Sequence, residues 1–140
     1  MSPALLLLAD GERSESMTKV LVTGGAGFIG SHVVDALISL GYEAVVIDNL
    51  TAGKLENIHN KARLYPIDIN DNKLGDIFTK EKPDYVIHLA AQTQVTKSIT
   101  NPRLDAEVNI NGTISLLQQC VQHRTKKLIY SSSGAVYGHS

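Results

Sequence analysis

The chain has 140 residues, of which 43% are apolar and four are prolines, a composition that excludes disordered and fibrous proteins and predicts one globular domain. Thirteen basic and fourteen acidic residues leave a net charge of -1, so neither nucleic acid nor a membrane surface is expected as a partner. The single cysteine, Cys120, cannot form an intramolecular disulfide and is predicted to lie in the core. This fits a reducing compartment, and we expect a cytoplasmic protein.

The first 16 residues differ from the rest of the chain. A short apolar run at residues 4–8 is followed by a polar stretch, and Met17 looks like the natural start. The run is too short to span a membrane, and no basic residue precedes it as in a secretory signal. We interpret residues 1–16 as a leader-like or tag-like extension; the alternative is an extra N-terminal element that covers the sheet.

A glycine-rich turn links the first predicted strand, residues 19–23, to a predicted helix that stops at Gly41. Apolar residues recur along this helix at helical spacing, namely Ile29, Val33, Leu37 and Leu40. Gly24 allows a sharp turn, Gly27 lets the backbone approach phosphates, and Gly30 lets the helix pack closely on the strand. Because the first N–H groups of a helix lack intrahelical partners and favour an anion, the turn predicts a dinucleotide diphosphate site.

An acidic residue follows the second predicted strand, residues 43–47. Asp48 lies about 20 residues beyond the glycines, where a carboxylate accepts hydrogen bonds from the adenosine ribose hydroxyls. A 2′-phosphate would be repelled there, so NAD is favoured over NADP. The alternative interpretation is that Asp48 merely begins a turn with Asn49.

The same alternation of strand and helix continues along the chain. A strand at 62–67 ends at Asp68, a helix capped by Asp71 ends at Pro83, and further strands cover 85–89 and 127–130. The helix after residue 71 turns three apolar residues inward, which are Leu74, Ile77 and Phe78. Asn101 and Pro102 begin the next helix, whose predicted apolar stripe consists of Leu104, Val108, Ile114, Leu117 and Val121.

Alternating strands and helices predict an α/β fold with a doubly wound parallel sheet, Rossmann-like, in the order 3-2-1-4-5. Ligands on such sheets bind beyond the carboxyl ends of the strands. Five segments follow strands in this way, namely residues 24–30, 48–53, 68–69, 90–92 and 131–133. We expect them to meet at one edge of the sheet.

Taken together, five motifs make the chain from residue 17 resemble the extended short-chain dehydrogenase/reductase family of NAD-dependent epimerases and dehydratases. They are TGGAGFIG at 23–30, DNL at 48–50, HLAAQ at 88–92, NINGT at 109–113 and SSSGAVYG at 131–138. The resemblance implies that NAD contacts Phe28 and Ile29 at the helix start, Asp48 and Asn49 at the ribose, and Asp68 and Ile69 at the adenine. It also implies a cofactor-binding role for Leu50, Gly53, Leu89, Ala90, Ala91, Gln92 and Asn109.

The resemblance further implies a catalytic role for Ser133, which would hydrogen-bond the C4 hydroxyl of a UDP-sugar. In the family, a tyrosine then removes the hydroxyl proton and a lysine four residues later lowers the pKa of that tyrosine. No tyrosine in this sequence has a lysine four positions on. We therefore interpret residues 17–140 as an NAD-binding domain truncated before that pair and before the substrate domain, inactive by itself. We expect a homo-oligomer that associates through the side of the fifth strand.

Particular residues argue for or against other functions. A nucleotide-sugar 4,6-dehydratase would carry an acidic pair directly after the serine, where Gly134 and Ala135 stand, so an epimerase is favoured. A non-catalytic NAD-binding module stays open. A hydrolase is disfavoured because the serines lack a Gly-x-Ser-x-Gly elbow and His139 has no adjacent acid.

The histidines show no spacing typical of a metal site, so no metal is expected. His88, at the end of the fourth predicted strand, is expected to be packed and hydrogen-bonded rather than catalytic.

Overall fold

The computed structural model describes residues 17–138, so the extension predicted for residues 1–16 and His139 lie outside the described residues. The elements, in chain order, are β1 (Lys19–Thr23), α2 (Phe28–Ser39), β2 (Glu43–Ile47), η1 (Leu55–Asn57), β3 (Arg63–Tyr65), α3 (Leu74–Glu81), β4 (Tyr85–His88), α4 (Val95–Thr100), α5 (Pro102–Ala106), η2 (Glu107–Asn111), α6 (Gly112–Gln122), β5 (Lys127–Tyr130) and η3 (Gly134–Tyr137).

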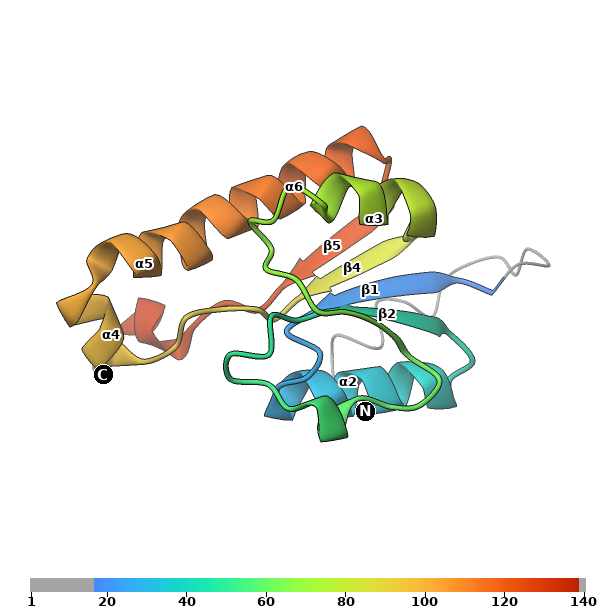
Figure 1. The fold of residues 1–140 in the computed structure, drawn as a ribbon, viewed down its shortest axis with the longest axis horizontal. Helices are drawn as coiled ribbons and strands as arrows, with labels where there is room; N and C mark the ends of the chain where they lie inside the picture. Colours follow the sequence, from blue (N-terminus) through green and yellow to red (C-terminus); the bar gives the residue numbers. More distant parts are fainter. Residues whose placement is uncertain (1–16, 139–140) are drawn as a thin grey trace.

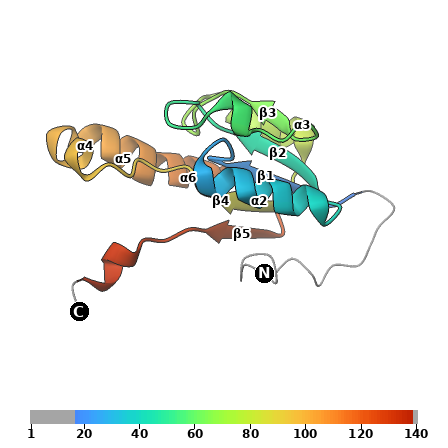
Figure 2. The same ribbon diagram turned by 90° about the horizontal axis from the view of Figure 1, so that it is seen from below.

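The strands form one parallel sheet in the order β3-β2-β1-β4-β5, which confirms the predicted topology. Helix α2 covers one face of the sheet, and α3 and α6 cover the other (Figure 1). The view from below shows the run from α4 through α5 to α6 extending beyond the sheet at its carboxyl edge (Figure 2). The three layers leave this edge open, because the connections that follow the strands spread apart there.

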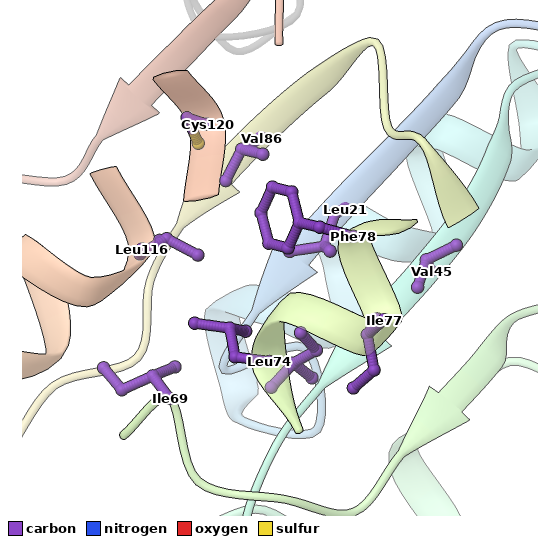
Figure 3. Close-up of a cluster of buried hydrophobic side chains, with 10 residues drawn as sticks. Leu21, Val45, Ile69, Leu74, Ile77, Phe78, Val86, Leu116 and Cys120 are labelled. Atoms are coloured by element: carbon purple, nitrogen blue, oxygen red, sulfur yellow. The ribbon is translucent and has the colours of Figure 1, made fainter. Parts of the chain in front are cut away.

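The core is divided between the two faces because successive strand residues point to opposite sides. Leu21 points toward α3 and α6, whereas its neighbours Val20 and Val22 point toward α2. Phe78 is fully buried in the cluster that contains Leu21, and the free cysteine Cys120 belongs to the same core cluster, as predicted (Figure 3).

The predicted apolar stripe is correct for α3, partly correct for α2, where Leu37 is buried as expected, and wrong for α6. In α3 the inward-facing residues are Leu74, Ile77 and Phe78, as expected. In α2 the buried positions are Gly30, Val34 and Leu37, and in α6 they are Gly112, Leu116 and Cys120. These two helices carry apolar residues on more than one face, so spacing alone did not identify the face that packs on the sheet.

Some predicted boundaries also differ. Strand β3 covers Arg63–Tyr65 instead of residues 62–67, β4 ends one residue earlier than expected, and α4 was not predicted. Helix α5 does begin after Asn101, whose Oδ1 accepts the Leu104 N–H at 3.2 Å. Short polar elements such as α4 carry too few apolar positions for a periodic signal.

A buried carboxylate joins several elements away from the open carboxyl edge. The Glu81 side chain at the end of α3 is fully buried and accepts hydrogen bonds from Lys19 Nζ at 2.9 Å, Arg63 Nη1 at 2.7 Å and the Tyr65 hydroxyl. Burial by itself would raise the pKa of Glu81, but the bonds from Arg63, Tyr65 and Lys19 outweigh it and lower that pKa to about 2. This cluster ties α3 to β1 and β3.

Candidate dinucleotide-binding site

Two adjoining hollows lie along the carboxyl edge of the sheet. The smaller, of about 140 Å³, reaches toward the ends of β2 and β3, and the larger, of about 800 Å³, reaches toward the end of β5. They share five lining residues, which are Gly24, Gly27, Leu89, Ala90 and Ala91. The hollows therefore form one groove that crosses the glycine turn.

The first glycine makes the turn between β1 and α2 fit against the end of β4. Gly24 has a φ of +71°, a left-handed conformation that a residue with a side chain rarely adopts. A Cβ on Gly24 would lie 2.8 Å from Ala90 N and 2.9 Å from Leu89 C, both backbone atoms. Only glycine at position 24 therefore lets the end of β1 lie directly against Leu89 and Ala90, which form the floor of the groove.

The start of α2 presents backbone donors to the larger hollow. The first intrahelical bond runs from Ser31 N–H to Gly27 C=O at 2.9 Å, so the N–H groups of Phe28, Ile29 and Gly30 have no partner four residues back. The N-cap, Gly27, adds no side-chain bond, and the first turn carries no acidic residue. Phe28, Ile29 and Gly30 all line the larger hollow, and this helix end favours an anion.

Asp48 lies at the end of β2 and lines the smaller hollow, 8% exposed. Its Oδ2 accepts the Ala26 N–H at 2.9 Å and its Oδ1 accepts the Leu50 N–H at 2.8 Å, which holds the carboxylate against the glycine turn. Each carboxylate oxygen can accept a further hydrogen bond. Leu50 itself has a φ of 58° and lines neither hollow, so the structure gives it a role in the turn rather than at the groove surface.

The far end of the smaller hollow is formed by residues after β2 and β3. Asn49 Nδ2 donates to Asp68 Oδ2 at 2.7 Å, which links the two loops. Ile69 is 4% exposed and belongs to the core cluster below the hollow. Gly53 also lines this hollow, and a Cβ there would lie 2.7 Å from the Cβ of Ala26. All the predicted residues in this region except Leu50 therefore line one cavity.

The larger hollow is bordered by an amide that supports its floor. Asn109 Oδ1 accepts the Gln92 N–H at 2.8 Å, and Asn109 Nδ2 donates to the Gln92 carbonyl at 3.0 Å. Nδ2 also lies 3.3 Å from Asp105 Oδ1. The Asn109 side chain thus pairs with the floor as a neighbouring strand would, and its predicted position beside the groove agrees with the structure.

Ser133 lies beyond the end of β5 and lines the larger hollow together with Ser131 and Ser132. Its Oγ accepts the Ala135 N–H at 3.2 Å at the start of η3. The Ser133 hydroxyl proton is not used in this contact, so the exposed side chain can donate a hydrogen bond into the hollow.

Three polar residues that sequence reasoning left without a role at the site adjoin the floor, namely Thr23, His88 and Thr113, and the last two line the larger hollow. Thr23 Oγ1 lies 2.7 Å from His88 Nδ1, and His88 Nε2 lies 3.0 Å from Thr113 Oγ1. His88 is thus packed and hydrogen-bonded, as expected, and its burial lowers its pKa. The sequence did offer one signal for two of these residues, since Thr23 and His88 are the polar last residues of the apolar strands β1 and β4.

Among residues 17–138, no cluster of three or more His, Cys, Asp or Glu side chains is arranged to hold a metal ion. Within the same part of the chain, no helix combines the length and apolar character that crossing a membrane requires.

Comparison with known proteins identifies the family. The model of the NAD dependent epimerase/dehydratase family matches residues 20–140. A UDP-glucose 4-epimerase from Mycolicibacterium smegmatis is 40% identical over 126 residues, covering 86% of this chain and 40% of its own length.

Solved structures agree in fold as well as sequence. The UDP-glucose 4-epimerase of Thermotoga maritima, solved with UDP-glucose, superimposes with a TM-score of 0.85 at 47% identity, over 88% of this chain and 40% of that one. The Thermus thermophilus UDP-glucose 4-epimerase, solved with NAD, gives a TM-score of 0.81 at 43% identity, over 84% and 38% of the two chains. The present chain spans about 40% of the length of these relatives. On these matches, it belongs to the NAD dependent epimerase/dehydratase family.

Proposed function

We propose that this chain forms the NAD-binding part of a nucleotide-sugar epimerase, a UDP-glucose (UDP-galactose) 4-epimerase that acts by transient oxidation at C4 of a UDP-sugar. The carrying observation is the continuous groove that has Asp48 at one end, the donor-rich start of α2 in the middle and Ser133 at the other end. A cytoplasmic setting suits the buried free thiol of Cys120.

Each part of the groove suits one part of NAD. Asp48 and Asn49 accept or donate hydrogen bonds at the adenosine ribose, while Asp68 and Ile69 border the adenine. The N–H groups at the start of α2 bind the diphosphate, for which the absence of an acidic residue in the first turn is favourable. The residues after β4, with Asn109 behind them, form the floor under the nicotinamide end.

The chemistry that NAD supplies in such an epimerase is removal and return of a hydride at the sugar C4. Ser133 donates a hydrogen bond to the C4 hydroxyl and orients it. Since no tyrosine in the sequence has a lysine four positions on, we propose that the chain alone binds the cofactor without turnover. Gly134 and Ala135 supply no acid for the water loss of a 4,6-dehydratase, which favours the epimerase.

Calorimetric titration tests the cofactor assignment. We expect saturable NAD binding and at least tenfold weaker NADP binding, because a 2′-phosphate would meet the Asp48 carboxylate. Asp48→Asn removes this charge and weakens an acceptor, so NAD affinity is expected to fall about tenfold while the penalty against NADP shrinks. Asp35→Asn, at an exposed position of α2, is the matched control and should bind both dinucleotides normally. Absence of binding to either dinucleotide would overturn the assignment.

We also infer that the chain forms a homo-oligomer. The support is an apolar face on α6, which packs over the β4–β5 side of the sheet and exposes Ile114, Leu117 and Val121 by 48%, 44% and 80%. We expect sedimentation velocity to show concentration-dependent association that Val121→Glu weakens. Val95→Glu, at a valine on α4 that is 71% exposed, should associate like the parent. A monomeric boundary for the parent at high concentration would contradict this inference.

A further inference from the structure

The floor of the groove, residues 89–92, is hydrogen-bonded at both of its ends. At one end, the N–H groups of Leu89 and Ala90 each lie 3.2 Å from Thr23 Oγ1. At the other end, the backbone of Gln92 is paired on both sides with the Asn109 amide, at 2.8 and 3.0 Å. These bonds hold the floor from β1 and from the π-helical segment η2.

The ring of His88 connects these two attachments. On one side it contacts Thr23 Oγ1, and on the other it contacts Thr113 Oγ1, which lies 2.8 Å from the Asn109 carbonyl oxygen. Thr23, His88, Thr113 and Asn109 therefore form an unbroken hydrogen-bonded path beside the floor, and the last three of them also line the larger hollow. The ring is 2% exposed, so water does not compete for its nitrogens.

The direction of every bond in this path follows from donor and acceptor capacity. A carbonyl oxygen can only accept, so the Thr113 hydroxyl donates to Asn109 and must accept from His88 Nε2–H. Thr23 Oγ1 accepts the Ala90 N–H at 3.2 Å and shares the Leu89 N–H, at 3.2 Å, with the Thr23 carbonyl oxygen, at 3.1 Å, which leaves its own proton to point to His88 Nδ1. The Thr113 end thus requires a ring protonated at Nε2, and the bonds at the Thr23 end fit the same neutral tautomer.

We propose that His88, as the neutral Nε2–H tautomer, is a positioning residue that sets the placement of the groove floor and thereby the affinity for the dinucleotide. This inference rests on the proposed function. In this role His88 acts on the floor through Thr23 and Thr113. A second ring proton, on Nδ1, would compete with the backbone N–H groups of Leu89 and Ala90 for the Thr23 oxygen, so the imidazolium form disturbs the path.

The surroundings of the ring decide how acid acts on it. The groups that face His88 are the Thr23 hydroxyl on β1, the Thr113 hydroxyl on α6 and the Tyr130 ring on β5, whose centroid is 5.6 Å away. Tyr130 is the titratable group among them, and no acidic or basic side chain is one of them. Burial lowers the pKa of His88 from its ordinary value of 6.5, so the neutral ring persists through neutral pH, and the positioning is lost only as the pH falls through this lowered pKa.

The test compares NAD affinity across threonine variants of the same chain. Thr113→Val keeps the shape of the side chain and removes the hydroxyl, and we expect a three- to tenfold loss of affinity at pH 7.5. Thr113→Ser restores the hydroxyl and should bind within about twofold of the parent. Thr79→Val is the matched control, because Thr79 on α3 also donates to a carbonyl four residues back, at 2.9 Å, but contacts no histidine. It should bind like the parent.

Two readouts that need no cofactor accompany the titration. Nitrogen-15 NMR of the ring is expected to show a protonated Nε2 and an unprotonated Nδ1, and amide exchange at Ala90 and Gln92 is expected to speed up in Thr113→Val but not in Thr79→Val. An Nδ1–H tautomer, or equal NAD affinity and equal exchange in the parent and Thr113→Val, would overturn the positioning role. Failure of the parent to bind NAD while these two readouts hold would instead overturn the proposed function.

Discussion

The substitution Gly24→Ala is expected to abolish NAD binding and to lower the free energy of unfolding by about 3 kcal/mol or more. Two costs add at this site. The left-handed backbone of Gly24 costs a residue with a side chain about 1 kcal/mol, and the new Cβ would lie 2.8 Å from Ala90 N. Because the atoms it meets are backbone, the floor of the groove must move to relieve the contact. Urea unfolding and calorimetric titration measure the two effects.

Two other glycines separate these costs. Gly41 has a φ of +85° and nothing within 4 Å of a Cβ, so Gly41→Ala carries the conformational cost alone, about 1 kcal/mol. Gly134 has an ordinary φ and equally open surroundings, so Gly134→Ala should change stability by less than about 0.5 kcal/mol. If Gly24→Ala were no more destabilising than Gly41→Ala, the close approach of β1 to the floor would be refuted.

The second large effect is expected away from the groove, at Glu81. Glu81→Gln should lower the free energy of unfolding by about 2 kcal/mol, because it removes the charge that Lys19 and Arg63 share. This loss of stability is smaller than that expected for a fully buried ion pair, because the Lys19 and Arg63 side chains are 19% and 51% exposed and water partly solvates their charges. Urea unfolding measures this loss of stability, as a shift of the transition midpoint with an unchanged dependence of the unfolding free energy on urea concentration.

The pH dependence of stability gives an independent signature of Glu81. Its pKa is about 2 in the folded chain and 4.5 ordinarily, so between these values the unfolded chain binds more protons than the folded chain. The contribution of Glu81 is therefore complete above pH 4.5 and is lost as the pH falls from about 4.5 to about 2. Glu81→Gln should flatten this part of the stability profile.

Glu56→Gln is the matched control for this experiment. Glu56 forms a single ion pair with Lys54 at 3.7 Å, and the two side chains are 77% and 69% exposed. Exposed pairs of this kind contribute little, so stability and its pH profile should stay unchanged. Equal effects of the two glutamine variants would contradict a special role for the buried cluster.

Local patterns in the sequence were sufficient to predict the order of strands, the glycine turn and most of the groove lining. Strands β1 and β2 are short apolar runs bounded by turn residues, and alternation with helices leaves few topologies. The segments that carry Asp48, Asp68 and Ser133 were expected at this edge because ligand-binding residues of such sheets follow the strands directly. Each of these inferences depends only on neighbours along the chain.

Contacts between distant segments decided the rest. Helix α6 buries the face that carries Leu116 and Cys120, because this face packs on the sheet. Ile114 and Val121 are also apolar but lie on exposed sides of the helix, so the spacing of apolar residues did not reveal which face is buried. The path from Thr23 through His88 to Thr113 joins residues 65 and 25 positions apart, and the Glu81 cluster joins residues up to 62 apart.

The sequence by itself thus determined which fold the chain adopts and where its ligand edge lies, since periodicity and turn chemistry are local properties. Only the tertiary structure decided which helix faces are buried and which polar side chains hold the groove floor. A hydrogen bond between residues that are far apart in the sequence forms only after the strands have paired and brought the two residues close together. A periodic pattern in the sequence does not predict which residues will meet in this way.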